Sequence, residues 1–75
     1  MSPERVKEGL EFVSRYASHV NEWVTVKKEL LKFFNSHERQ YFSTRDPITK
    51  KQGINEFEKA LILLWENMTG KKLNT

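Results

Sequence analysis

The chain has 75 residues, of which 37% are hydrophobic, 31% charged and 12% aromatic, with a formal net charge of +3 and no cysteine. This length accommodates a single small domain, residues 1–75, and excludes a multidomain enzyme. The absence of cysteine excludes disulfide cross-links and thiolate zinc sites. The aromatic and aliphatic content is sufficient for a hydrophobic core, so the composition differs from that of a disordered chain.

The apolar residues do not form a long uninterrupted run. The longest run covers six residues, 60–65, whereas a membrane-spanning helix needs about 20. The N-terminus, Met1 to Arg5, leads into a charged segment rather than an apolar one. We therefore expect neither a signal peptide nor a transmembrane helix, and we expect a cytoplasmic protein that does not bind membranes.

The N-terminal half carries a helical pattern. Ser2 followed by Pro3 is typical of a helix start, with serine as the N-cap and proline in the first turn. From Val6 to Phe34, apolar residues recur at intervals of three and four, and a second apolar column lies one residue earlier. Such spacing predicts a wide apolar face on a helix.

One continuous helix over 3–35 would be about 50 Å long, whereas a compact chain of this size has a diameter of about 30 Å. The pattern therefore favours two helices, 3–18 and 21–35, with a break at which Ser18 or Asn21 caps the second helix. The alternative is a single long helix whose outer half packs against another chain.

The C-terminal part carries the clearest helix signals. Asn55 with Glu58 three residues later indicates a helix start, and Gly70 indicates its end, so we predict a helix over 55–69. Residues 36–53 are expected to be irregular or partly helical. The predicted fold is all-α, a small bundle of three main helices with or without a fourth short helix. Its predicted core comprises Leu10, Val13, Ala17, Val20, Val24, Leu31, Phe34, Phe57, Leu61, Leu64 and Met68.

The sequence lacks the motifs of catalytic and metal sites. His19 and Glu22 stand one turn apart, but a zinc site needs three or four ligands. Gly9, Gly53 and Gly70 are isolated, so there is no glycine-rich phosphate loop, and no nucleophile elbow is present. We therefore expect a non-enzymatic protein with no metal, no cofactor and no small-molecule substrate.

The basic residues are concentrated in the middle of the chain. Residues 27–53 carry seven basic and three acidic side chains, a net charge of +4. If these residues converge in space, they form a patch that binds nucleic acid through its phosphates. The alternative is an ordinary solvated face. The candidate nucleic-acid-binding residues are Lys27, Lys28, Lys32, Arg45, Lys50 and Lys51.

The leading functional hypothesis is a small interaction module. Two Trp, two Tyr and five Phe are many aromatic residues for so short a chain, and aromatic side chains dominate protein-binding hot spots. The module would bind an unidentified protein partner or a second copy of itself through an aromatic-rich helix face. Alternatively, these large side chains simply fill the core. The candidate protein-binding residues are Trp23, Leu30, Phe33, Leu63 and Trp65.

Overall fold

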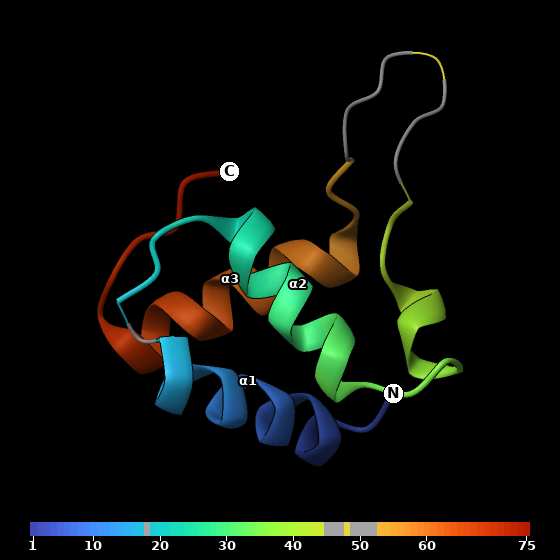
Figure 1. Cartoon of the computed structure of the whole chain (residues 1–75), viewed down its shortest axis with the longest axis horizontal. Helices are drawn as coiled ribbons and strands as arrows, with labels where there is room; N and C mark the ends of the chain where they lie inside the picture. The colour runs from blue at the N-terminus through green and yellow to red at the C-terminus, as the bar shows by residue number, and fades with distance from the viewer. Residues whose placement is uncertain (18, 45–47, 49–52) are drawn as a thin grey trace.

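A computed structural model of the chain describes all residues except 18, 45–47 and 49–52. Its elements in chain order are α1 (Pro3–Ala17), α2 (Trp23–Phe33), the 3₁₀ turn η1 (Glu38–Tyr41) and α3 (Glu56–Thr69) (Figure 1). Apart from one isolated β-bridge, the described residues contain no strand. The predicted all-α fold with three main helices is confirmed, and η1 is the fourth, short helical element.

The first two helices are separate, as the length argument predicted. α1 ends at Ala17, α2 begins at Trp23, and the longest extent of the molecule is 34 Å. The Ser2 hydroxyl accepts a hydrogen bond from the Arg5 N–H at 3.3 Å, which confirms the predicted cap of α1. The predicted cap at Asn21 is wrong, because Glu22 is the N-cap of α2 and makes no side-chain cap bond. The predicted alternative at Ser18 lies outside the described residues.

The C-terminal segment supplies the bond that is missing at the start of α2. The carbonyl of Asn74 accepts from the Trp23 N–H at 2.9 Å, and the Asn74 N–H donates to the Asn21 carbonyl at 2.6 Å. Leu73 is buried beside these bonds, and its N–H donates to the Glu66 carboxylate at 2.8 Å. The C-terminus therefore lies beside the start of α2 (Figure 1).

The boundaries of α3 agree with the predicted signals. The Asn55 side chain accepts from the Glu58 N–H at 2.8 Å. Gly70 has a φ of +70°, a left-handed conformation that favours glycine, and its N–H donates to the Glu66 carbonyl. The Glu58 carboxylate, however, does not complete a reciprocal capping box in the described structure. It turns into the protein interior instead.

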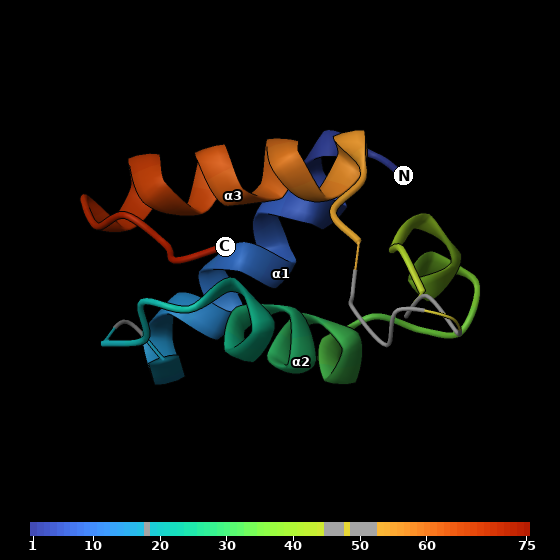
Figure 2. The ribbon, with the colours of Figure 1, turned by 90° about the horizontal axis from the view of Figure 1, so that it is seen from above.

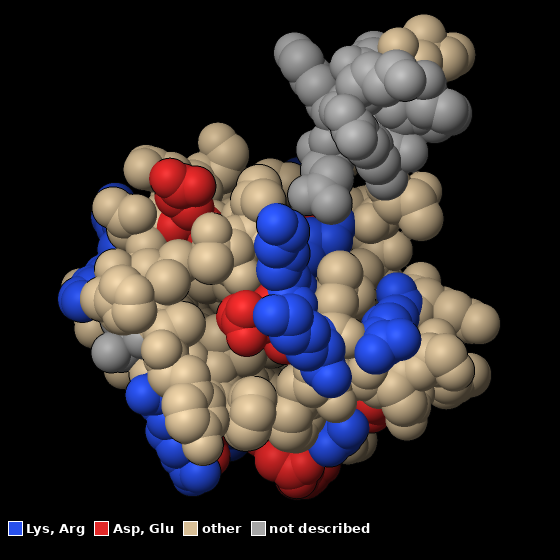
Figure 3. Space-filling model, viewed as in Figure 1, with Lys and Arg blue, Asp and Glu red and all other residues tan. Residues whose placement is uncertain are grey.

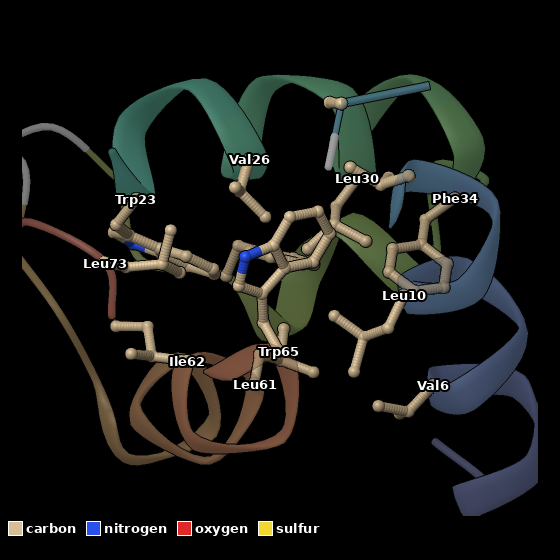
Figure 4. Close-up of a cluster of buried hydrophobic side chains, with 13 residues drawn as sticks. Val6, Leu10, Trp23, Val26, Leu30, Phe34, Leu61, Ile62, Trp65 and Leu73 are labelled. Carbon is tan, nitrogen blue, oxygen red and sulfur yellow. The ribbon is translucent and has the colours of Figure 1, made fainter. Parts of the chain in front are cut away.

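The core lies between the three helices. α2 and α3 lie on opposite sides of the molecule in Figure 2, and α1 packs against both. Trp65 projects from α3 into the centre, among Val26, Leu30 and Leu10, and is completely buried (Figure 4). Its indole N–H has no hydrogen-bond partner within the described part of the chain. Trp65 therefore stabilises the core by packing alone.

The close approach of α1 to the end of α2 depends on Gly9. A Cβ atom at this position would lie 2.7 Å from Cζ of Phe34, which is closer than real Cβ contacts. Phe34 is itself buried and stacks near Phe42, with ring centroids 5.9 Å apart. Glycine at this position therefore lets the aromatic ring of Phe34 lie directly against the helix backbone.

Part of the predicted core is wrong because two helices are rotated about their axes. In α2, Trp23, Val26 and Leu30 are buried, whereas Val24 is exposed and Leu31 only half-buried. In α3, Leu64 and Met68 are exposed, and the buried face carries Glu58, Leu61, Ile62 and Trp65 instead. The insertion of Trp65 and of the Glu58 carboxylate between the helices sets this rotation. The remaining predicted core residues are buried or half-buried.

Candidate functional site

An apolar groove of about 470 Å³ lies between α3 and the N-terminal part of the chain. The wall from α3 recurs at helical intervals and includes Phe57, Ala60, Leu61, Leu64 and Met68. This stripe lies beside the buried face of α3, so the helix presents apolar side chains both to the core and to the groove. The methyl side chain of Ala60 leaves the hollow open, whereas a larger side chain would fill it.

The opposite wall of the groove comes from α1 and the residues before it. It is formed by Met1, Pro3, Val6, Lys7 and Leu10. Lys7 is the one charged member, and its Nζ lies 4.0 Å from the Glu11 carboxylate in solvent. The aliphatic stem of Lys7 therefore covers apolar surface while its ammonium group stays hydrated at the rim.

A buried ion pair lies between α2 and α3. Lys27 Nζ is 3.1 Å from Glu58 Oε2, and the two side chains are 2% and 0% exposed. The Glu58 carboxylate also accepts from the Trp23 indole N–H at 3.2 Å and from the Ser43 N–H at 2.6 Å. Lys27 Nζ donates to the Ser43 carbonyl at 2.9 Å and to its hydroxyl at 3.2 Å. Both charges are thus paired and hydrogen-bonded, as a buried pair requires.

This cluster fixes the ionisation of its carboxylate. Burial by itself raises the pKa of Glu58, but the hydrogen bonds from Ser43 and the ammonium group of Lys27 outweigh it, and the pKa is lowered. The Ser43 hydroxyl also donates to the Gly53 carbonyl. The cluster therefore ties α2 and α3 to both ends of the segment between Ser43 and Gly53, which is a structural role.

Arg5 joins α1 to the start of η1 through polar contacts. Its guanidinium lies 2.7 Å from the Glu38 carboxylate and 4.4 Å from the centre of the Phe33 ring. This contact lowers the pKa of Glu38 and raises that of Arg5, chiefly through the hydrogen bond between them. Glu38 also accepts from the Asn35 N–H at 3.0 Å, so α1 is joined to η1 over the end of α2.

The predicted protein-binding face does not exist as one surface. Trp23, Leu30 and Trp65 are buried core residues, because α2 and α3 turn these side chains inward. Phe33 is half-buried beneath Arg5. Leu63 is 66% exposed but lies outside the groove. The prediction that these five residues form an accessible face is therefore wrong, and the apolar surface lies elsewhere on α3.

The predicted basic patch is only partly described. Lys27 is not available to a phosphate, because it is buried against Glu58. Lys28 and Lys32 are exposed on α2, and Lys32 Nζ lies 3.2 Å from Glu29. Basic side chains gather over α2 and its neighbour η1, with acidic side chains among them (Figure 3). The other candidates, Arg45, Lys50 and Lys51, lie outside the described residues.

Comparison with protein-family models, curated proteins and solved structures finds no match to this chain. Among the residues that the structure describes, no three His, Asp or Glu side chains are placed to hold a metal ion. None of the described helices has the length and apolar character needed to cross a membrane.

The sequence contained part of the signal for the groove. Phe57, Leu61, Leu64 and Met68 share one face of the predicted helix; the sequence pattern predicts this face as core, and the structure places it along the groove. Nothing in the pattern placed Met1 and Pro3 opposite that face, because the contact depends on how α1 crosses α3. The partner of Glu58 was equally hidden, since Lys27 is 31 residues away in the chain.

Proposed function

We propose that this protein is a small protein-binding module whose groove between α1 and α3 receives an apolar helix from a protein partner or from a second copy of the chain. The observation that carries the proposal is the exposure of Leu64 and Met68, 45% and 41%, along the edge of the groove. Leucine and methionine side chains that continue an apolar hollow into solvent are typical of surfaces that bury themselves against another protein.

The groove differs from the other exposed apolar residues. Tyr16 lies against the ring of Phe12 on α1, with centroids 5.0 Å apart, and Val24 is exposed on α2, but none of the three lines the groove. The groove instead combines two apolar walls with a concave shape, and its α3 wall has the spacing of a helix that packs against another helix. This arrangement supports helix-in-groove binding.

The proposal is tested by photocross-linking in the source cell. A benzophenone amino acid at Met68 should form covalent adducts with protein, whereas the same probe at Val24, on the exposed side of α2, should form few. A Leu64→Glu substitution should abolish the Met68 adducts, and Leu63→Glu should preserve them. Equal adducts at both probe positions, or adducts that survive Leu64→Glu, would overturn the proposal.

A nucleic-acid-binding module is the second candidate. It is supported by the exposed Lys28 and Lys32 and by the gathering of basic side chains over α2 (Figure 3). Phosphate binding weakens steeply as salt increases, whereas an apolar interface does not. A titration with a short DNA duplex and a short RNA, at low and moderate salt, separates the two candidates. Lys28→Glu combined with Lys50→Glu should abolish salt-sensitive binding and leave the Met68 adducts unchanged.

A further inference from the structure

We infer that residues 71–75 form a strap that opens and closes while the three-helix core stays folded, and that its closure completes the first turn of α2. This conformational device is independent of the proposed function, because none of the five strap residues lines the groove. Its contacts join two segments that lie far apart in the sequence.

The strap runs from the end of α3 to the start of α2 (Figures 1 and 2). The left-handed conformation of Gly70 ends α3 and turns the chain. Asn74 then lies beside Glu22 in an isolated parallel bridge. The Asn74 N–H donates to the Asn21 carbonyl at 2.6 Å, and the Asn74 carbonyl accepts from the Trp23 N–H at 2.9 Å. One strap residue therefore bonds to the chain on both sides of the N-cap of α2.

The second of these bonds satisfies a group that α2 cannot satisfy by itself. Trp23 is the first residue of the helix, so its N–H has no acceptor in a preceding turn. Glu22, the N-cap, makes no side-chain bond to the helix. When the strap opens, the Trp23 N–H is left to water, and the first turn of α2 loses the bond that fixes its start.

Leu73 is the anchor of the strap. Among residues 71–75 it alone is buried, and the other four are exposed. Its side chain lies beside Trp23 and Ile62 at one end of the core (Figure 4), and its N–H donates to the Glu66 carboxylate at 2.8 Å. The conformational entropy of five ordered residues opposes the burial of this one side chain. The closed strap is therefore only weakly favoured over the open one.

The rest of the core is held by contacts that the strap does not make. Trp65 packs among Val26 and Leu30 in the centre of the molecule (Figure 4), and the ion pair between Lys27 and Glu58 joins α2 to α3. A segment with few buried apolar contacts opens at a lower free energy than such a core. The strap is therefore a cooperative unit of its own, which opens far more often than the three helices unfold.

Native-state hydrogen exchange of the full chain tests the inference. The amides of Trp23, Leu73 and Asn74 should have protection factors that agree within about threefold and are at least about 100-fold lower than that of the Leu30 amide. Low concentrations of urea should accelerate exchange steeply at Leu30 and little at the strap, because the response to urea scales with the surface exposed. Protection equal to that of Leu30 would overturn the inference. So would a complete lack of protection, since a strap that is always open cannot complete α2.

A substitution at the anchor separates the strap from the core. Leu73→Asp should hold the strap open, because the closed form would bury a carboxylate without a partner. The Trp23 and Asn74 amides should then exchange at the rates of an unstructured chain, while the Leu30 amide keeps a protection factor of at least about 100. Leu63→Asp, exposed on α3, is the matched control and should leave the protection of the strap amides within about threefold of wild type.

Two results with Leu73→Asp would contradict the inference. Loss of protection at Leu30 would show that the core does not survive the opening of the strap. Unchanged protection at Trp23 would show that the strap does not complete the first turn of α2.

Discussion

The two sides of α3 carry the opposite of what residue type alone would suggest. On the side that faces α2, the helix buries a carboxylate, Glu58, against the ammonium group of Lys27. On the side beside the groove, it leaves Leu64 and Met68 about half exposed. The charged side chain is therefore inside and the apolar side chains are outside, within three turns of the same helix.

The comparison shows that the partners available to a side chain, more than its polarity, decide whether α3 buries it. Glu58 has an ion-pair partner and two further hydrogen-bond donors, so its burial leaves no carboxylate oxygen unpaired. Leu64 is only partly packed within the chain, and its remaining apolar surface is removed from water only by another molecule. The first side is complete as it stands, whereas the second leaves apolar surface in water that, under the proposed function, a bound partner covers.

The largest expected effect is a loss of folding stability when the buried ion pair between α2 and α3 is disrupted. Lys27→Met should reduce the free energy of unfolding by about 3–5 kcal/mol, because it leaves the Glu58 carboxylate buried without a counter-charge. Chemical denaturation followed by circular dichroism measures the change. Lys28→Met, one residue away on the exposed face, should change the same quantity by less than about 0.5 kcal/mol.

A double variant sharpens the interpretation of that loss. Lys27→Met combined with Glu58→Gln removes both charges, and the amide oxygen of the glutamine still accepts from one of the two donors, Trp23 or Ser43, which bond separate oxygens of the carboxylate. The double variant should recover part of the lost stability. A double variant as unstable as the sum of its two single variants would show that the two charges act independently, contrary to the observed geometry.

Acid should also reduce the stability that the buried ion pair provides, reversibly and by less than Lys27→Met does. The folded pKa of Glu58 is lowered below its ordinary value of 4.5, so its stabilising contribution is complete above that value and is lost as the pH falls through the folded pKa. Urea denaturation between neutral pH and about pH 3 measures this loss. Glu38 also has a lowered pKa, so the relevant quantity is the difference between wild type and Glu58→Gln. A variant with the wild-type pH dependence would contradict the assignment to Glu58.

Local signals in the sequence predicted the helices well, and contacts between helices remained hidden. Asn55 and Gly70 mark the ends of α3 because capping depends on residues within one turn. The length of the chain predicted the break before α2, and the break is present. The rotation of α3 depends instead on the insertion of Trp65 and on Lys27, a residue on another helix. For this reason the sequence pattern places Leu64 in the core, although Leu64 lines the groove.

A smaller loss of stability is expected where α1 packs against the end of α2. Gly9→Ala should reduce the free energy of unfolding by about 1 kcal/mol, because overpacking costs about 1–3 kcal/mol and the gain in helix propensity returns about 1 kcal/mol. The added Cβ would lie 2.7 Å from Cζ of the buried Phe34. Gly53→Ala, where no atom of the described residues lies within 4 Å of the added Cβ, should change stability by less than about 0.5 kcal/mol. A more stable Gly9→Ala variant would mean that Phe34 moves freely.

The smallest expected effect on folding stability comes from a substitution on the groove side of α3. Leu64→Gln should change the free energy of unfolding by less than about 0.5 kcal/mol when it is measured on the isolated chain in dilute solution. Much of the Leu64 surface already faces water in the single chain, 45% of it, so a polar side chain of similar size should cause little loss. The same substitution should weaken the binding of a partner at the groove.

Leu61→Gln, buried one turn earlier, should cost several times more in folding because its amide would be enclosed without partners. Equal costs at Leu64 and Leu61 would mean that the two sides of α3 both belong to the core, and the groove would then have no role outside the chain.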